Sequence, residues 1–569
     1  MSGSSSGDLP SATDRGGPDP TAGAAQGADQ TGQVLLNRRR FLLEGVAFVA
    51  AGAIVGAGAI LLATAGMGRP RRPTTTLPPG LAPTPAGATE EPIQSAPPPG
   101  PGRVARENER RGTNRWEIPL HGRGNAEGYA SDVSVTAGDQ FSLHLSSTLP
   151  QAGISLYRLG WYGGNGARLI ARWPNVPIAP QPAPTTDPVT GLIRATWSPA
   201  VSASVPDGWV SGLYLAVIAP LGGSPQYTTF VVRESQPAAP ILFVSSTTTH
   251  QAYNPWGGKS LYPDQSTGAL TVSGGTNAVV VSWDRPYASH RGAGLVLRWE
   301  YPFVRWIESR GYDVGYAADL DLERHPEMLA GRRLIVFVGH PEYWSVAMRR
   351  NLEAAIEAGT NVAFFSANEI YWRVRYGDLA GRPYRTVTCY RTASLDPLAT
   401  VDPAQATVKW RDEPSPDPES RVVGQMYGHM LLAPADFVCS APDHWLYAGT
   451  GMSAGDRIAN LIGQEYDRYW TAPGLAPAGT RVLAASPVRP NLGHLVGVYG
   501  PAPSGEPWPP QATATIYTAP SGATVFAAGT QQWSWGLDGW GSPDFEGVTT
   551  PVDPRVATMT SNILDRLGT

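Results

Sequence analysis

The stretch RRLIVFVGHPEYWS, residues 332–345, decides the fold of this chain. Its uninterrupted apolar run, 334–338, is typical of a strand buried on both faces of a parallel sheet. The residues that follow, 345–356, have helical periodicity, with Ser345 as the predicted N-cap. Ligands of open α/β sheets bind beyond the carboxyl ends of the strands. His340 and Glu342 are therefore predicted at a ligand site, and the alternative is an ordinary helix start.

The same alternation of strands and helices extends over residues 237–569. Apolar runs predict buried strands at 241–244, 279–281, 312–316, 334–338 and 361–365. Helical spacing predicts helices at 295–310 and 345–358, the second followed by Gly359 as the residue past its C-cap. This order indicates a doubly wound, mostly parallel α/β domain.

Residues 108–236 have a different period. Segments 141–145, 154–159 and 228–233 alternate apolar and polar residues, as half-buried strands do. Short strands at this pace predict an immunoglobulin-like β-sandwich. The turn GWYGGNG, 160–166, carries two aromatic residues that either face a ligand or pack at a domain interface, and the second is favoured.

The N-terminal segment of the chain indicates the compartment. Residues 1–37 lack aromatics and are expected to be disordered. The motif NRRRFLL, 37–43, resembles a twin-arginine export signal. Residues 45–68 carry no charge and are long enough to span a bilayer of ~30 Å. Segment 38–68 is thus either a cleaved signal or a retained membrane anchor, and both place the protein outside the cytoplasm.

A Pro-rich linker, 69–107, follows and favours an extended polyproline II conformation. The formal net charge of −4 gives no basic footprint for nucleic acid. Outside the cytoplasm, Cys389 and Cys439 are expected either to pair as a structural disulfide or to remain inert thiols.

Two further constellations follow predicted strands. The loop THQAYNPWGGKSLY, 249–262, contains Tyr253, and SWDRPY, 282–287, ends at Tyr287. Together with His340 and Glu342, they bring phenols, an imidazole and a carboxylate towards one sheet edge. Phenolate and carboxylate oxygens are hard ligands that suit ferric iron. The alternative for each tyrosine is a half-buried core residue whose hydroxyl is satisfied.

Polar residues also follow the strand at 361–365. Asn368 would reach the same edge, and Arg373 either holds a substrate or pairs with Glu369, four residues earlier. Residues 427–429 and 464–467 are further candidates for the cavity wall.

The order of these motifs resembles the large (beta) subunit of N,N-dimethylformamidase. The resemblance rests on YNxxGG from 253, DRPY from 284, GHPEYWS from 339 and AN at 367. The tail motifs GATVFAAGT, 522–530, and WSWGLD, 533–538, agree, and the similarity runs from about residue 128 to the C-terminus.

The resemblance implies a mononuclear ferric iron, held by two tyrosinates and one glutamate, that hydrolyses a small amide C–N bond. The α/β domain should then resemble the glutamine amidotransferase-like fold. The glutamate ligand matches Glu342, its neighbouring histidine matches His340, and the first tyrosine ligand matches Tyr253. The second matches Tyr287, with Tyr301 as a rival. Candidate substrate-contacting residues are Asn254, Asn368 and Arg373.

The functional hypothesis is an exported or membrane-anchored hydrolase of a small-molecule amide. The alternative is a non-catalytic binding or scaffold protein of the cell envelope on the same fold. The export signal and the Pro-rich linker are not features of a cytoplasmic amidase. No small partner subunit is inferred, no nucleic acid is expected, and homo-oligomerisation is left open.

Overall fold

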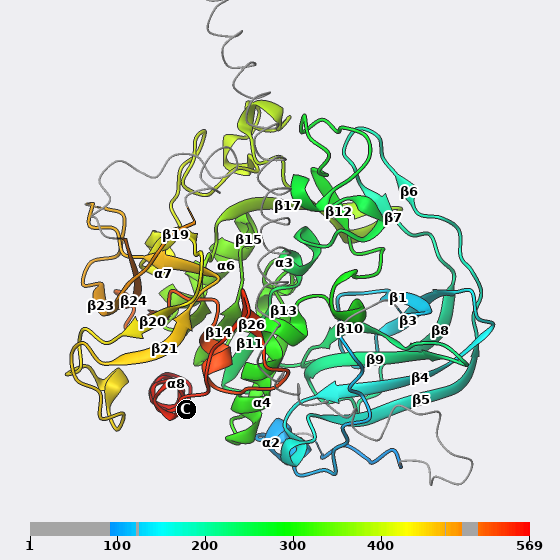
Figure 1. Ribbon diagram of the computed structural model, residues 1–569, viewed down its shortest axis with the longest axis horizontal. Helices are drawn as coiled ribbons and strands as arrows, with labels where there is room; N and C mark the ends of the chain where they lie inside the picture. The colour runs from blue at the N-terminus through cyan, green and yellow to red at the C-terminus, as the bar shows by residue number, and fades with distance from the viewer. Residues whose placement is uncertain (1–91, 99, 121–123, 473, 492–509) are drawn as a thin grey trace, which may run out of the picture. The chain divides into compact units, whose positions relative to one another are not determined.

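The computed structural model describes residues 92–98, 100–120, 124–472, 474–491 and 510–569 (Figure 1). The chain divides into two compact units, 1–79 and 80–569, and all described residues belong to the second. The predicted disordered tail, the export signal or anchor and most of the linker lie outside the described residues. Within those described ranges, no helix is both long and apolar enough to cross a membrane.

The end of the predicted linker forms a helix, α2 (Arg103–Asn108). Its Glu107 is fully buried and forms an ion pair with Arg168 of the first β-layer. A carboxylate is rarely buried without a partner, so this pair holds the helix against the globular part.

Two sheets form the first layer. One has the order β1 (Ala126–Ala130), β3 (Gln140–Ser147), β8 (Pro199–Ser204). The other has the order β2 (Ser134–Val135), β10 (Gln226–Val232), β9 (Gly212–Pro220), β4 (Gln151–Leu159), β5 (Ala167–Pro177). Alternate residues such as Phe141 and Leu143 of β3 share one core with Ile154 and Leu156 of β4. The period of two in the sequence therefore produces a buried face between the sheets.

The second layer is a seven-stranded sheet. Its order is β13 (Val314–Ala318), β11 (Ile241–Ser245), β14 (Leu334–Gly339), β16 (Asn361–Ser366), β25 (Thr524–Ala527), β24 (Gln511–Thr518), β23 (Arg481–Pro487). The strands from β13 to β25 pair in parallel, and β24 and β23 are added antiparallel. The fold is thus mixed α/β with additional β-sheets. The immunoglobulin-like and amidotransferase-like topologies stay predictions.

Helices cover both faces of this sheet. Phe243, Val336 and Phe365 point to a core shared with α4 (Tyr301–Ser309) and α8 (Pro554–Leu567). Leu242 and Ile335 point the other way, to a core shared with α6 (Val346–Glu357). Strands buried on both faces explain the uninterrupted apolar runs in the sequence. As predicted, Ser345 caps α6, and its hydroxyl accepts the backbone N–H of Met348 at 3.1 Å.

The strand predicted at 279–281 exists but lies outside this sheet. It forms β12 (Val280–Ser282) in a side sheet of order β12, β18 (Arg382–Thr388), β17 (Trp372–Leu379), β15 (Tyr343–Ser345). It pairs antiparallel with β18, so the expectation that it joins the parallel sheet is wrong. The residues that follow this strand, up to Tyr287, therefore do not lie at the carboxyl edge of the parallel sheet, where they were expected.

The remaining described elements are short. The strands are β6 (Thr185–Thr186), β7 (Ile193–Arg194), β19 (Met426–Met430), β20 (Ala435–Val438), β21 (Arg457–Ile462), β22 (Glu465–Arg468), β26 (Asp544–Phe545) and β27 (Val548–Thr549). The helices are α3 (Thr247–Ala252), α5 (Asp321–Arg324) and α7 (Ser420–Val423). Cys389 and Cys439 are both buried and free, which agrees with the inert-thiol alternative.

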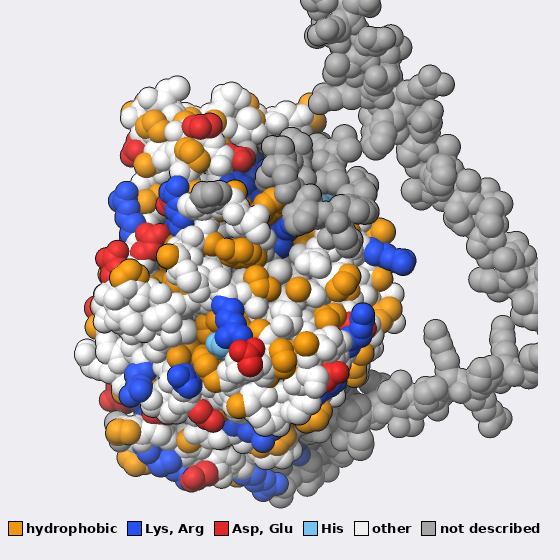
Figure 2. All heavy atoms as spheres, turned by 90° about the vertical axis from the view of Figure 1, so that its left-hand side faces the viewer, with side chains coloured by type: hydrophobic (Ala, Val, Ile, Leu, Met, Phe, Trp, Pro, Cys, Tyr) orange, Lys and Arg blue, Asp and Glu red, His pale blue; other side chains and the backbone are white. Residues whose placement is uncertain are grey.

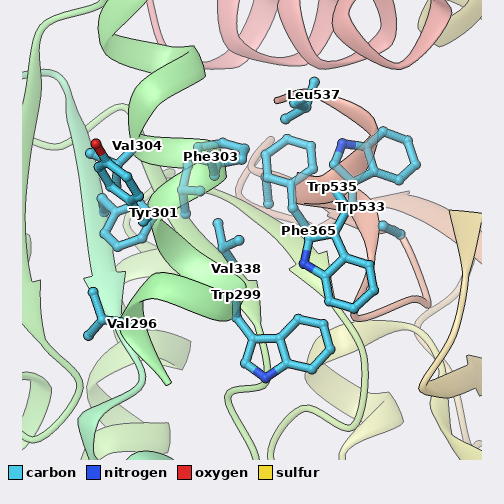
Figure 3. Close-up of a cluster of buried hydrophobic side chains, with 14 of the residues drawn as sticks. Val296, Trp299, Tyr301, Phe303, Val304, Val338, Phe365, Trp533, Trp535 and Leu537 are labelled. Carbon is cyan, nitrogen blue, oxygen red and sulfur yellow. The ribbon is translucent and has the colours of Figure 1, made fainter. Parts of the chain in front are cut away.

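The helix predicted at 295–310 begins as a π-helical turn, η5 (Val296–Glu300), and continues as α4. Trp535 Nε1 donates to the Arg298 carbonyl at 2.9 Å, and Ser534 Oγ donates to the Trp299 carbonyl at 2.8 Å. Figure 3 shows Trp299, Trp533 and Trp535 in one aromatic cluster beside α4. The WSWG motif, which forms the 3-10 turn η11 (Trp533–Gly536), thus supports the irregular start of this helix.

A buried ion pair joins the first layer to the second. The guanidinium of Arg158 on β4 lies 2.7 Å from Glu308 of α4, and both side chains are fully buried. The hydroxyl of Tyr316 on β13 also donates to Glu308, at 2.6 Å. Tyr162, from the Gly-rich turn, donates to Glu107 at 2.9 Å. The Tyr162 hydroxyl also accepts from Arg158 at 3.1 Å, so Tyr162 packs beside the ion pair that joins the layers.

Charged side chains are interspersed on the face of the described residues drawn in Figure 2. Lys and Arg side chains alternate there with Asp, Glu and apolar ones, and that face shows no continuous basic patch. This arrangement agrees with the mildly negative composition.

Candidate functional site

The turn after β14 brings His340 and Glu342 to the carboxyl edge of the sheet, as predicted. Gly339 has φ +75, and a Cβ at this position would lie 2.5 Å from that of Trp299, so the turn requires glycine. Glu342 is fully buried, and its backbone N–H donates to Thr249 Oγ1 at 3.1 Å. The end of β14 and the start of α3 therefore fix this carboxylate together.

Two phenols meet the Glu342 carboxylate. The Tyr262 hydroxyl donates to its two oxygens at 3.1 and 3.2 Å, and Tyr253 forms a hydrogen bond with the same group. The rings of Tyr253 and Tyr262 stack with centroids 4.2 Å apart. Tyr343 donates to the Tyr262 hydroxyl at 2.7 Å. Oxygens from two phenols and one carboxylate thus converge at one point of the interior.

His340 lies between two carboxylates. Its Nε2 is 3.3 Å from Glu342 Oε2 and 3.1 Å from Glu465 Oε2. Glu465 Oε2 also accepts hydrogen bonds from Asn368 Nδ2 at 2.9 Å and Gln531 Nε2 at 2.7 Å. Asn368 Nδ2 lies 3.3 Å from His340 Nε2. The imidazole, one carboxylate and two amides therefore form a connected polar cluster beside the phenols.

The backbone around Asn368 is strained into this position. Its φ of 58 is left-handed, and its N–H donates to Asp467 Oδ1 at 2.7 Å. Asp467 hydrogen-bonds in turn with Glu369, which accepts the Ser366 hydroxyl at 2.7 Å. The amide oxygen of Asn368 is buried and has no hydrogen-bond partner among the described residues. Such an orphan acceptor marks a place for a water or a ligand.

Burial controls the charges of the cluster. It raises the pKa of Glu342 to about 7, with His340 opposing the rise and Glu465 adding to it. Burial alone would lower the pKa of His340. The carboxylates of Glu465 and Glu342 outweigh this effect, so the net result is a raised pKa. The imidazole is therefore stabilised as a cation between two acids.

Arg391 supplies a second cation. Its guanidinium donates to the Tyr343 hydroxyl at 2.6 Å and lies 4.0 Å from the ring centroid of Tyr262. Burial, and then Glu342, hold the pKa of Tyr262 well above its usual range, while Arg391 acts in the opposite direction. Arg391 thus favours negative charge on the phenol that faces Glu342.

A pocket of about 440 Å³ opens onto the cluster. Its lining includes Tyr253, Tyr262, His340, Glu465 and Gln531 from the cluster. The other lining residues are Pro263, Asp264, Gln265, Ser289, His290, Leu295, Arg298, Trp299, Met430 and Gln464. A small organic molecule fits a space of this size.

The structure brings together Tyr253, His340, Glu342 and Asn368 of the predicted site. It places Tyr287 elsewhere, beside a cavity of about 30 Å³ and with its ring 6.5 Å from His250. Tyr287 follows β12, which belongs to the side sheet, and this explains its distance from the cluster.

The rival Tyr301 is fully buried on α4, where its hydroxyl donates to the Gly166 carbonyl at 2.8 Å. Figure 3 shows it within the cluster of buried hydrophobic side chains. Tyr301 is therefore a core residue.

Two residues that were predicted to contact a substrate, Asn254 and Arg373, make other contacts in the structure. Asn254 donates to Gln251 Oε1 and to the Pro286 carbonyl, both at 2.8 Å, and so organises its own loop. The Arg373 guanidinium lies 4.4 Å from the ring centroid of Trp410 and donates to the Ser415 carbonyl at 2.8 Å. The expected pair of Arg373 with Glu369 does not form, because Glu369 binds Ser366 and Asp467 instead.

Three residues of the cluster, Tyr262, Glu465 and Gln531, are not singled out by the sequence. Tyr262 lies in the quoted loop 249–262, nine positions after Tyr253, and no spacing rule for tyrosine ligands singles it out. Glu465 of β22 was included only as part of 464–467, and Gln531 follows β25. Because these segments meet only through the tertiary fold, no local pattern identifies them.

The donor chemistry fits a hard cation. The described residues hold no group of three or more His, Cys, Asp and Glu side chains arranged to bind a metal. A metal at this site would therefore depend on tyrosine oxygens, and Tyr253, Tyr262 and Glu342 provide a set of hard oxygen ligands.

Comparisons with solved structures give only distant similarities. One is the sporulation control protein Spo0M from Bacillus subtilis, with 11% identity, 21% of this chain and 51% of that chain covered, and a TM-score of 0.14. Another is a β-glucosidase from Erythrobacter marinus, with 13% identity, coverages of 19% and 15%, and a TM-score of 0.12. The chain thus covers about half or less of each, and such TM-scores carry no argument.

No curated protein matches the chain significantly. A family model does match: N,N-dimethylformamidase beta subunit-like, C-terminal, over residues 153–547. The matched range is more than half of the chain and includes all members of the cluster. The chain belongs to the N,N-dimethylformamidase beta subunit-like, C-terminal family.

Proposed function

We propose that this protein hydrolyses the C–N bond of a small amide, with a mononuclear ferric iron held by Tyr253, Tyr262 and Glu342. The observation that carries the proposal is the convergence of two phenols on the buried Glu342 carboxylate, next to the His340–Glu465 pair. Tyr262 replaces the Tyr287 expected from the sequence, because Tyr262 is the second phenol in contact with Glu342.

When bound, the iron would supply Lewis acidity to an amide carbonyl and to water. The protein's own groups would handle the proton. Because the imidazole of His340 is stabilised as a cation between the two carboxylates, it would give its proton to the departing amine and regain one from the attacking water. Glu465 would hold the imidazole in place, and Asn368 and Gln531 would hold Glu465. The pocket lining would orient a small amide against this cluster.

The place of action is part of the proposal. The motif at 37–43 and the uncharged segment 45–68 support work outside the cytoplasm, either tethered to the membrane or released. The substrate would then be a small amide that reaches the cell exterior.

Metal analysis and formate release from N-alkylformamides, both on the purified full chain, test the proposal. We expect iron bound near one per chain, a tyrosinate-to-iron absorption band in the visible, and release of formate. Glu342→Ala should lose both the iron and the band, because the site loses one of its three anionic oxygens.

A colourless protein that takes up no iron and hydrolyses no amide would contradict the proposal. If such a protein co-sediments with isolated cell-wall glycan, the binding-module alternative holds instead.

A further inference from the structure

The lining of the pocket includes an arginine, Arg298. Among the described residues that line it, Arg298 is the one arginine, and lysine is absent. Arg298 belongs to the π-helical turn η5, a feature that recurs at functional sites. The next residue, Trp299, packs against Gly339, which directly precedes His340. Arg298 and the polar cluster therefore face the same space.

The guanidinium of Arg298 is held in place before any ligand arrives. It lies 4.9 Å from the ring centroid of Trp299 and 5.4 Å from that of Trp535, and these rings stack at 4.8 Å. Figure 3 shows both tryptophans in the cluster of buried hydrophobic side chains. One nitrogen, NH2, donates to the backbone carbonyl of Asp544 at 3.0 Å. The remaining donors of the planar fork are not used by these contacts.

The charge of Arg298 has no acidic side chain paired with it among the described residues. By contrast, Arg305 on the next helix lies 3.1 Å from Asp538, and Arg158 lies 2.7 Å from Glu308. Burial lowers the pKa of Arg298, with the charge of Asp544 opposing the shift. A partly desolvated guanidinium without a directly paired carboxylate is costly, and an anionic ligand would relieve this cost.

The pocket lining thus combines acidic and phenolic groups with one guanidinium. Glu465 and the phenols line it together with Arg298. The acid Asp264 also lines the pocket, but its side chain is exposed at the surface. A molecule with an amide at one end and an anion at the other would bind in a single orientation. A planar carboxylate matches the fork of an arginine best.

We propose that Arg298 binds a carboxylate on the substrate, so that the substrate class is a small amide with a free carboxylate, such as an N-acyl amino acid. This inference rests on the proposed function and adds the substrate class to it. In the hydrolysis, the C–N bond breaks, the hydroxyl of water goes to the acyl carbon, and its proton goes to the amine nitrogen. The carboxylate on Arg298 is unchanged throughout.

Calorimetric titration of the metal-free full chain tests the inference without catalysis. The probes are N-formylglycine, N-formyl-β-alanine and N-formyl-4-aminobutyrate, each against its neutral methyl ester. We expect at least one acid to bind about tenfold or more tightly than its ester, as charge-assisted bidentate pairing gives. Arg298→Gln should remove this difference and leave ester binding unchanged.

A matched control is available on the same helical segment. Arg310 also lies over a tryptophan, 5.6 Å from the ring centroid of Trp306, but it does not line the pocket. Arg310→Gln should keep the full preference for the acid. Arg298→Lys keeps the charge but loses the planar fork, so it should retain a reduced preference for the acid over its ester. This variant replaces Arg298→Gln in the test if Arg298→Gln does not fold.

Equal binding of acids and esters by the unmodified protein would overturn the inference, as would no binding of any acid. A preference that survives in Arg298→Gln would also overturn it. Tighter binding of N-formylethylenediamine would assign recognition to Asp264 and an amine instead. These results are independent of iron content and formate release, so failure of the proposed function is recognised separately.

Discussion

At the scale of single residues, the second phenol of the site decides the metal assignment. Tyr262 contacts both oxygens of Glu342, whereas Tyr287 lies by a separate small cavity. We therefore predict that Tyr262→Phe weakens iron binding by at least about tenfold, because a ligand should matter at least as much as its supporting groups. The visible band should shift or disappear, as measured by absorption spectroscopy with metal analysis.

Tyr287→Phe is the matched control and should keep the iron and the band. If Tyr287→Phe loses the metal while Tyr262→Phe keeps it, the assignment made from the sequence is correct and the one made here is wrong.

Glu465 permits a second prediction, on a residue outside the metal ligands. Its Oε2 accepts hydrogen bonds from the side-chain amides of Asn368 and Gln531 and lies 3.1 Å from His340. Glu465→Gln removes the charge that faces the imidazole, so formate release should fall by about a hundredfold, within the range of general acid–base catalysis. Iron content should stay the same. Loss of iron in this variant would place Glu465 among the metal ligands.

The comparison of these residues shows how far local sequence patterns reach. His340, Glu342 and Tyr253 were predictable because each follows a recognisable strand, and such positions meet at the carboxyl edge. Glu465 and Gln531 lie on β22 and after β25, and their contact spans 66 residues. Tyr287 lies away from Glu342 because the strand before it, β12, pairs in the side sheet, although its apolar run resembles a strand of the parallel sheet.

At the scale of elements, the π-helical turn η5 depends on the C-terminal WSWG motif. Trp535 Nε1 and Ser534 Oγ bind the carbonyls of Arg298 and Trp299. Trp535→Phe would leave the Arg298 carbonyl without this donor, at a cost of about 1–3 kcal/mol. We predict a lower midpoint of thermal unfolding, measured by circular dichroism.

Trp256→Phe is a suitable control for this prediction, since its indole donates no hydrogen bond to any described residue and it is only partly buried. An equal loss of stability in both variants would mean that ring packing, and not the hydrogen bond, supports the turn. The sequence predicted this region as one regular helix, because the period of a π-turn cannot be separated from that of an α-helix over five residues.

At the scale of the whole globular part, the Arg158–Glu308 pair connects the β-layer to the α/β layer. Both side chains are fully buried. Arg158→Met would leave Glu308 charged and unpaired, which costs about 3–5 kcal/mol, and the double variant Arg158→Met/Glu308→Leu should recover much of this loss. Chemical denaturation followed by tryptophan fluorescence measures both.

The exposed pair of Arg481 and Asp443, at 2.7 Å with side chains 45% and 73% exposed, is the control. Arg481→Met should change stability by less than about 1 kcal/mol. If Arg158→Met behaves like Arg481→Met, this ion pair does not stabilise the contact between the two layers. The layers themselves were predictable from the change in hydrophobic period, but their connecting ion pair was not, since its partners lie 150 residues apart.

The wide separation of the cluster members along the chain has a consequence for the order of folding. The contact of Tyr262 with Glu342 closes a loop of 80 residues, and that of Asn368 with Glu465 closes one of 97. Closing a long loop costs conformational entropy before the contact that it brings together can stabilise the chain, so these contacts form late. A growing or partly folded chain therefore holds no assembled set of hard oxygens. Iron capture would then report that folding is complete, and the bound ion would stabilise only the finished protein.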